Sequence, residues 1–397
     1  QPAPPPAPTA TGQPGEPRGA AAEAAAAVNQ LGIKLWAEQP RATNVFYSPY
    51  SIHQALGQLY LGAAGATRTQ IGQLLRATGD DAADQAGWRA LAAALRPRQG
   101  LESAFTLHSA NGIFAQRGHP FRREYLRAVG AGEGGAEARE LDYEGQPEAA
   151  RVAINDWVSE QTTGTITGAV GPDVLTANTR LVLVNAVYFK AAWLDQFDEQ
   201  AATAGTFTLH DGTEVTLPFM HARSELEYVE TPEFQAVRLP YVGGQTSALV
   251  ILPRPGAAEA VESALSAGHL AETLAVASER RVVLALPRFA LRPALSLAEN
   301  LRALGLTDAF VPGGADFSAL DGTRDLYLSE ALHDAYVKVD EQGTEAAAVT
   351  SVSMGTLSLS PPPEPVVMTV DRPFLFLVRD DATGALLFLG RIADPRG

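Results

Sequence analysis

The fold is decided by the stretch "LHDAYVKVDEQGTEAAAVT", residues 332–350. In its first half, small or apolar residues alternate with larger polar ones. Successive side chains of a strand point to opposite faces, so this alternation predicts a strand with one face in the core. The expected buried face holds His333, Ala335, Val337 and Val339, and the opposite face holds Asp334, Tyr336, Lys338 and Asp340.

An uncharged segment follows this strand. No charged residue occurs from Ala346 to Pro363, and yet the segment is too rich in Gly, Ser and Pro to be an ordinary core element. Read alone, such a segment is typical of a loop or a short strand. We interpret it as a strand that is exposed in one state of the protein and buried in another.

The overall composition is that of an ordinary globular protein. The chain has 397 residues, of which 46% are apolar, so it can bury a large core in one large domain or two ordinary ones. The net charge of −15 argues against nucleic acid and heparin as partners, because both bind clustered positive charge. No apolar run approaches the roughly 20 residues that cross a bilayer. With no cysteine, the chain has no disulfide and no thiolate chemistry.

Residues 1–19, "QPAPPPAPTATGQPGEPRG", are rich in proline, alanine and glycine. Such a segment cannot bury enough surface to offset its ordering entropy, which predicts a flexible or polyproline-like tail. The first residue is Gln1 and not Met. A cleaved export signal explains both features, and so does truncation of a longer chain. We expect a secreted or periplasmic protein.

Residues 20–397 contain no internal repeat and no linker, which predicts a single mixed α+β domain with several sheets. A near-continuous apolar run at 180–193, "RLVLVNAVYFKAAW", indicates a strand covered on both faces. Near the end, "PFLFLV" and "ALLFLGRI" flank a polar turn and predict a buried hairpin. Helices are predicted at 19–38, at 48–63 with Ser48 as its cap and Pro49 in its first turn, and at 66–76, 79–96, 120–130, 147–161, 256–273 and 295–304.

Catalytic motifs are mostly absent. None of the seven histidines is followed by Glu, no serine has Lys three residues later, and neither a G-x-S-x-G elbow nor a Walker loop occurs. We therefore expect neither a metal site, nor a cofactor, nor an enzyme. A serine, histidine and aspartate that converge in space stay an alternative, because triads are defined by geometry.

Five separated motifs resemble those of the serpins, in the order and approximate spacing of that family. The resemblance covers residues 20–397 nearly end to end and implies a fold of three β-sheets and eight or nine helices with an exposed reactive-centre loop, here about 341–365. The implied activity is suicide inhibition of a protease by a prokaryotic or otherwise exported serpin. The motifs are "NVFYSPYSIHQALGQLYLGAAGATRTQI", "INDWVSEQTTGTI", "LVLVNAVYFKAAW", "LYLSEALHDAYVKVDEQGTEAAAVT" and "DRPFLFLVRDDATGALLFLGRIADP".

In a serpin, the segment after Glu341 is a bait loop. The target protease is acylated by the loop, which then inserts as a new central strand and distorts the enzyme. Alternate residues must then be small or apolar, while Glu345 can remain on the opposite face. The inward-facing residues that meet this requirement are Thr344, Ala346, Ala348, Thr350 and Val352. Gly343 suits a hinge. The resemblance implies a hinge formed by Glu341, Gly343, Thr344, Glu345, Ala346, Ala347, Ala348, Val349 and Thr350.

The resemblance also places the scissile bond by counting. The residue that matches Glu341 usually lies sixteen positions before the cleaved bond, which points to Leu357 followed by Ser358, with Met354 and Leu359 as alternative cleavage sites. A medium apolar residue implies chymotrypsin-like, subtilisin-like or elastase-like targets and excludes trypsin-like ones. Serine proteases are the expected covalent partners of a monomeric inhibitor, with cysteine proteases as a second class.

Two further sites carry over from the family. Ser48, Ser51, Asn185 and His333 match the shutter, a polar cluster beneath the centre of the sheet, and Trp193 matches the breach, where insertion begins. Each also has a plain structural interpretation, as a helix cap, a satisfied core polar group or a core aromatic. Non-inhibitory serpins share this fold, so a binding or chaperone-like protein is the alternative function.

Overall fold

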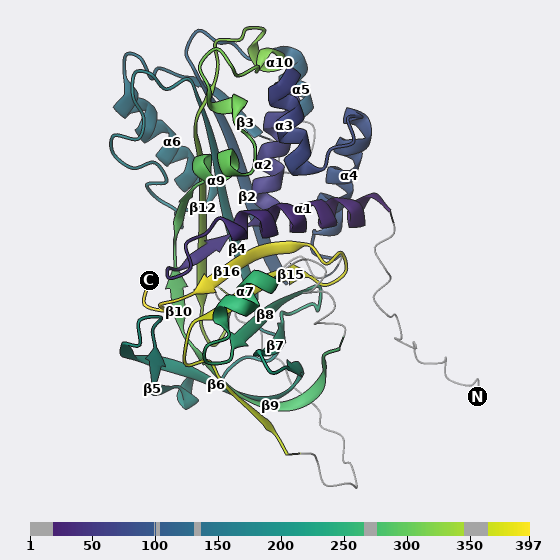
Figure 1. Cartoon of the computed structure of the whole chain (residues 1–397), viewed down its shortest axis with the longest axis vertical. Coiled ribbons are helices and arrows are strands. Elements are labelled where there is room, and N and C mark those ends of the chain that lie inside the picture. The colour runs from purple at the N-terminus through teal and green to yellow at the C-terminus, as the bar shows by residue number, and fades with distance from the viewer. Residues whose placement is uncertain (1–18, 99, 101–103, 131–135, 266–275, 345–363) are drawn as a thin grey trace, which may run out of the picture.

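The computed structural model describes residues 19–98, 100, 104–130, 136–265, 276–344 and 364–397 (Figure 1). Helices α2 to α6 gather at one end of the molecule and strands β5 to β9 at the other, with β2, β4 and β12 running between them. The helices of the described residues are α1 Ala20–Ala37, α2 Pro49–Gly62, α3 Gly65–Leu75, α4 Asp81–Ala94, α5 Arg123–Gly130, α6 Pro147–Gln161, α7 Ala258–Ala264, α9 Ala298–Ala303 and α10 Ser318–Asp321.

The first sheet has seven strands, in the order β10-β12-β13-β4-β2-β3, with β11 paired to β12. At its centre β4 and β12 run parallel, from Leu328 opposite Leu181 to Tyr336 opposite Tyr188. We call the boundary between these two strands the seam. The strands are β2 Phe105–Gln116, β3 Ala136–Leu141, β4 Leu181–Ala192, β10 Phe289–Leu291, β11 Ala294–Ser296, β12 Leu328–Val339 and β13 Gly343–Thr344.

The second sheet has nine strands, in the order β1-β16-β15-β8-β7-β6-β9-β14, with β5 paired to β6. The 17-residue β6 pairs with β5 over residues 214–219, with β9 over residues 219–228 and with β7 over its last three residues, so it joins two groups of strands into one sheet. The strands of the described residues thus form two continuous sheets. The strands are β1 Val45–Tyr47, β5 Thr203–Thr208, β6 Glu214–Glu230, β7 Phe234–Pro240, β8 Thr246–Pro253, β9 Ser278–Pro287, β14 Val366–Thr369, β15 Phe374–Asp380 and β16 Leu386–Ile392.

Helix α2 connects the two sheets, because it contacts β2 and β4 of the first and β16 of the second. Nearly every residue of the helix is buried, so the helix is covered on all sides and not on one face alone. Ser48 caps it by accepting a hydrogen bond from the Ser51 backbone N–H (3.1 Å), and Pro49 lies in its first turn, both as predicted.

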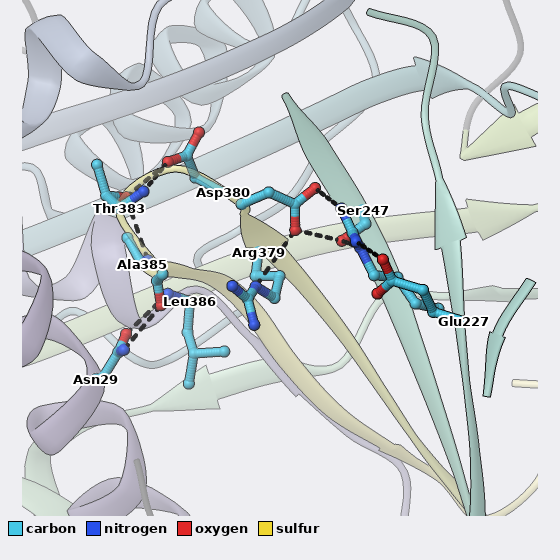
Figure 2. Close-up of polar contacts among 11 residues, drawn as sticks. Asn29, Glu227, Ser247, Arg379, Asp380, Thr383, Ala385 and Leu386 are labelled. Atoms are coloured by element: carbon cyan, nitrogen blue, oxygen red, sulfur yellow. Dashed lines mark hydrogen bonds and ion pairs between the residues drawn. The ribbon is translucent and has the colours of Figure 1, made fainter. Parts of the chain in front are cut away.

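The predicted C-terminal hairpin is confirmed, since β15 and β16 pair antiparallel and both are almost wholly buried. A set of polar residues around its turn forms what we call the hairpin network (Figure 2). Asp381 accepts from Ser247 Oγ (2.7 Å) and pairs with Arg238 (2.8 Å), and Thr383 donates to Asp380 (2.7 Å). The network consists of Asn29, Glu227, Arg238, Ser247, Arg379, Asp380, Asp381 and Thr383.

Two helix predictions are wrong in part. The helix predicted over 295–304 is shorter, because residues 294–296 pair with β12 as β11 and only Ala298–Ala303 are helical. The helix predicted over 256–273 begins at Ala258 and ends at Ala264 with Leu265 in an extended conformation, while 266–275 lie outside the described residues. In both cases a tertiary backbone partner or a local turn overrides the helical spacing of apolar residues.

The alternation predicted for 333–340 holds on the core side, where Ala335, Val337 and Val339 are buried. Asp334 departs from it, because this residue is only 2% exposed. Its carboxylate forms a two-pronged ion pair with Arg292 (2.7 and 3.1 Å), which compensates its burial. A charged side chain with such a partner can occupy a covered face that the sequence pattern marks as polar.

Candidate functional site: the seam of the first sheet

The centre of the site is a polar row that crosses the first sheet. His333 of β12 lies opposite Asn185 of β4, which in turn lies opposite Asn111 of β2. Residues opposite one another on neighbouring strands point to the same face, so the three side chains meet. All three are buried, with exposures of 0% for His333 and 1% for each asparagine.

Hydrogen bonds assign the proton on His333. The backbone N–H of Ser48 donates to Nε2 (3.0 Å), so the proton of the neutral ring is on Nδ1, which donates to Asn185 Oδ1 (2.5 Å). Burial lowers the pKa of His333 to about 3, which keeps the ring neutral. The contact between Nδ1 and Oδ1 spans the seam.

The amide of Asn185 continues the chain of hydrogen bonds. Its Nδ2 donates to Ser51 Oγ (2.5 Å) and to Asn111 Oδ1 (2.6 Å), and Ser51 Oγ also meets Ser109 Oγ (2.6 Å). We call this set the seam network. It consists of Ser48, Ser51, Ser109, Asn111, Asn185 and His333.

The structure therefore brings together the four residues that the sequence singled out as a shutter, Ser48, Ser51, Asn185 and His333. Sequence reasoning missed Ser109 and Asn111. Both belong to "FTLHSANGIFAQ", in which Asn111 is a polar residue within the buried run 110–116 and Ser109 immediately precedes that run. That pattern was a usable signal, but the partner of Asn111 is 74 residues away in the chain.

At one end of the seam, Trp193 holds the segment that follows β12. Its indole Nε1 donates to the Asp340 carbonyl (2.9 Å), and its backbone N–H donates to the Gln342 carbonyl (3.0 Å). The ring is 1% exposed and stacks on Tyr241, with ring centroids 4.6 Å apart. Trp193 is thus both a core aromatic and a fixed point for the start of the loop.

Residues Gly343 and Thr344 already lie between the two strands of the seam. As β13 they pair with Ala192 and Ala191 of β4, and Thr344 also lies opposite Val339 of β12. Thr344 is 1% exposed, and its Oγ1 meets the hydroxyl of Tyr241 (2.6 Å). Beyond β13, the seam is closed by direct pairing of β12 with β4, from Leu328 to Tyr336.

The packing around Gly343 leaves no space for a side chain. A Cβ built there would lie 2.1 Å from the Ala191 carbonyl oxygen and 2.8 Å from the Ala192 Cα. Both atoms are backbone, so they cannot give way as the end of a flexible side chain can. Glycine is needed here for close approach of backbones, in addition to the hinge freedom expected from sequence.

Glu341 is buried before the loop begins. Its side chain is 5% exposed and forms an ion pair with Arg288, whose Nη2 lies 2.5 Å and whose Nε lies 2.7 Å from Oε1. The carbonyl of Glu341 accepts from the Phe197 backbone N–H (3.0 Å). Arg288 was not predicted, because nothing in its local sequence, "LPRFA", indicates a partner 53 residues away.

The rest of the predicted loop cannot be placed. The hinge residues Glu345, Ala346, Ala347, Ala348, Val349 and Thr350, and the bond residues Met354, Leu357, Ser358 and Leu359, lie outside the described residues, as does the tail 1–18. Within the described residues, no group of three or more His, Asp or Glu side chains is arranged to hold a metal ion. No helix in the same residues is long and apolar enough to span a bilayer.

Comparison with known proteins agrees with this architecture. The family model described as "Serpin (serine protease inhibitor)" matches residues 26–395. An uncharacterized serpin-like protein of Thermococcus kodakarensis is 39% identical over 93% of this chain and 85% of its own length. Leukocyte elastase inhibitor A of Rattus norvegicus is 33% identical over 89% of this chain and 93% of its own length.

Among solved structures, human thyroxine-binding globulin in complex with thyroxine matches with a TM-score of 0.85 and 28% identity, over 96% of this chain and 100% of that one. Three observations point to the same family. They are the fold of mixed helices and sheets, the polar row across the seam, and the family match over nearly the whole chain. The chain belongs to the serpin family. As a member of a family of inhibitors and related non-catalytic proteins, it is not an enzyme.

Proposed function

We propose that this protein is a suicide inhibitor of serine proteases with chymotrypsin-like, subtilisin-like or elastase-like specificity. The observation that carries the proposal is β13, because Gly343 and Thr344 already occupy the position in which a longer inserted strand would begin. The residues that follow are uncharged from Ala346 to Pro363, so the same strand can extend into the seam. We infer a single domain over residues 20–397 that acts as an exported monomer.

The chemistry belongs to the target enzyme. Its serine hydroxyl adds to the carbonyl carbon of Leu357, the bond to the Ser358 nitrogen breaks, and the new amine of Ser358 leaves with the proton from the serine hydroxyl. An ester then joins the protease to Leu357. Water would hydrolyse this ester in an ordinary substrate, so inhibition requires that the loop inserts first.

Insertion replaces one parallel ladder by two antiparallel ones. The bonds between β4 and β12 are lost, and the new strand pairs with both neighbours in the orientation that β13 already has. A net gain of about a dozen hydrogen bonds at roughly 1 kcal/mol each supplies on the order of 10 kcal/mol. The hydrogen bond between His333 and Asn185 crosses the seam, so it must open before the new strand can extend past this pair.

The direct test is incubation with chymotrypsin, followed by denaturing electrophoresis and mass spectrometry. We expect an adduct of one protease per inhibitor that survives denaturant, and a released peptide that begins at Ser358. The substitution Leu357→Arg should redirect adduct formation to trypsin. A peptide that begins elsewhere would move the scissile bond to Met354 or Leu359, and absence of any adduct with apolar-specific proteases would refute the inhibitor proposal.

The alternative function is a non-inhibitory serpin that binds a ligand or acts as a chaperone. The similarity to thyroxine-binding globulin favours it, because that protein is complexed with thyroxine in its crystal structure. Thr344→Arg separates the two functions. A charge at this buried position should slow insertion and convert an inhibitor into a substrate, whereas Glu345→Arg, on the opposite face by alternation, should leave the adduct yield unchanged. Equal adduct yields for both variants would show that insertion does not depend on this face.

A further inference from the structure

A cleft lies between α1, α3 and α4, beside the N-terminal end of α1 (Figure 1). Its volume is 600 Å³, and Ala20, the first residue of α1, lies in its wall. The start of α1 packs closely on α4 here, because a Cβ built at Gly87 would lie 3.6 Å from the Ala20 carbonyl oxygen. Residues 1–18 lie outside the described residues, and they join the chain at Gly19, one residue before the wall of the cleft.

The wall holds a buried carboxylate oxygen without a partner. Asp84 of α4 lines the cleft and is only 8% exposed. Its Oδ1 accepts from the backbone N–H (2.8 Å) and from the hydroxyl (2.9 Å) of Thr78. Its Oδ2 is shielded from solvent and has no hydrogen-bond partner within the described residues. A buried carboxylate is costly unless it is paired and hydrogen-bonded, so the cleft calls for a cationic donor at this position.

The residues that precede Gly19 carry a complementary charge. The charged residues of 1–18 are Glu16 and Arg18, and only Gly19 separates Arg18 from the wall. Gly19 has φ 89° and ψ −142°, a backbone conformation that glycine adopts readily, so the chain turns immediately before α1. Arg18 therefore complements Asp84. In the same way Glu16 complements Arg76, a lining residue that forms no ion pair within the described residues.

The cleft also has an aromatic surface that suits proline. Trp88 lines it and is partly buried, and its ring is held edge-on by His53 and Tyr60, with interplanar angles of 82° and 81°. Proline-rich segments bind aromatic-lined grooves at a low entropy cost, because the polyproline II helix is already extended. Pro14 and Pro17 are three residues apart, which is one turn of that helix, so both face the same side.

We propose that residues 13–18 of this chain, "QPGEPR", dock in the cleft between α1, α3 and α4. Arg18 pairs with Asp84, and the two prolines of the segment pack on Trp88. The docked segment satisfies the buried carboxylate and fastens the start of α1 to α4. Neither the seam nor the loop takes part, so the docking does not depend on the proposed inhibitory function.

Acrylamide quenching of tryptophan fluorescence tests the docking in the full chain. Trp36, Trp157 and Trp193 are 6%, 3% and 1% exposed, whereas Trp88 is only partly buried. The quencher therefore reports on Trp88 above all, and a docked segment shields this ring from it.

Arg18→Gln removes the cation and lies outside the described fold, so it should release the segment, and acrylamide should then quench the fluorescence more steeply. Asp84→Asn keeps an acceptor for Thr78 and should have the same effect. The double variant should be quenched no more than either single variant, because both substitutions break the same contact.

Trypsin gives a second measure, because the protease must take the Arg18 side chain into its own specificity pocket. The rate is followed by mass spectrometry of the released peptide 1–18. Asp84→Asn should raise it about tenfold, since undocking no longer breaks a charge-assisted hydrogen bond. The matched control is Asp81→Asn in the first turn of the same helix. Asp81 is exposed, pairs with Arg68 and does not line the cleft, so its variant should be cleaved at the native rate.

Three outcomes would overturn the proposal. Unchanged quenching in Arg18→Gln would show that this residue does not hold the segment in the cleft. Equal trypsin rates for the Asp84→Asn and Asp81→Asn variants would show that the buried carboxylate does not bind it. Quenching of the native protein that becomes steeper on dilution would place the segment of a second copy in the cleft, and docking within one chain would be wrong.

Discussion

The seam network is almost wholly buried and the hairpin network is partly buried, and the two are built from different polar groups. The seam network uses neutral hydroxyl, amide and imidazole groups, and its bond across the seam joins His333 to Asn185. The hairpin network uses two arginines and three carboxylates, and it ties β15 and β16 to α1, β6, β7 and β8 (Figure 2).

This difference indicates which part of the protein can move. Neutral hydrogen bonds can be exchanged for others at little net cost, whereas separating buried charges leaves each of them uncompensated. We infer that the first sheet opens at the seam, while the β15–β16 hairpin stays fixed and serves as the frame.

Cleavage of the loop should have the largest effect. Cutting after Leu357 allows insertion at the seam, and a gain on the order of 10 kcal/mol should raise the melting temperature by about 10 °C or more. An ordinary surface loop responds in the opposite direction, since a nick only removes a constraint. Thermal unfolding of intact and cleaved protein checks this prediction, and a cleaved form that melts at or below the intact one excludes insertion.

Hydrogen exchange on the same two forms locates the effect. Amides of β4 and β12 should become more protected after cleavage, while those of Thr383 and Leu386 in the hairpin should not change. A large change in the hairpin would contradict its role as a frame.

Removing the imidazole of His333 should have the next largest effect. In His333→Ala, the backbone N–H of Ser48 and the side-chain Oδ1 of Asn185 lose their hydrogen-bond partners. Each buried group left without a partner lowers the free energy of unfolding by about 1–3 kcal/mol. The native melting temperature should fall by about 4 °C. His210→Ala, at an exposed position, is the matched control and should not change it. Equal melting temperatures of the two variants would show that the seam network does not stabilise the native state.

The two networks should respond to pH in opposite directions. Burial lowers the pKa of His333 from 6.5 to about 3, so the unfolded chain binds a proton that the folded protein does not. The stability due to this residue is present above pH 6.5 and is lost as the pH falls toward 3. Melting scans from pH 7 to pH 4 should therefore show a steeper loss for the native protein than for His333→Ala. Parallel curves would indicate that His333 is protonated in the folded state.

The smallest effect is expected at Asp380. Burial raises the pKa of this carboxyl despite its hydrogen bonds from Thr383, so its contribution to stability is present at low pH and is lost as the pH rises through the folded pKa. Asp380→Asn keeps an acceptor for Thr383 without the buried charge. The variant should melt about 2 °C higher than the native protein near pH 8, with the difference vanishing at acidic pH. A variant that is less stable near pH 8 would show that the charge supports the hairpin network.

The sequence predicted the parts of this contrast that depend on local pattern. The apolar run of β4, the hairpin and the Ser48 cap each follow from spacing along a few residues. The serpin resemblance pointed to Asn185 and His333, which no local pattern would have joined across 148 residues. The roles of the shutter, the breach and the scissile bond stay predictions.

Pairings without a local pattern or a family motif were not predicted. Asp334 is buried because Arg292 reaches it, and residues 294–296 form a strand because β12 offers them a partner. Arg288 and Tyr241 were missed for the same reason, since each meets the start of the loop from a distant segment. The hairpin network escaped prediction because its residues come from five separate elements and the turn between β15 and β16.

The two residues of β13 have a consequence for timing. Forming the first contacts of a new strand costs loop-closure entropy before any ladder bonds repay it. In this protein the pairing of Gly343 and Thr344 is already in place. Under the proposed function, insertion therefore proceeds by propagation and needs no nucleation. The fate of a captured protease then depends on two competing rates, the rate at which water hydrolyses the ester and the rate at which the strand inserts. Because β13 already fixes the register of the strand, insertion begins without a nucleation delay and is favoured over hydrolysis.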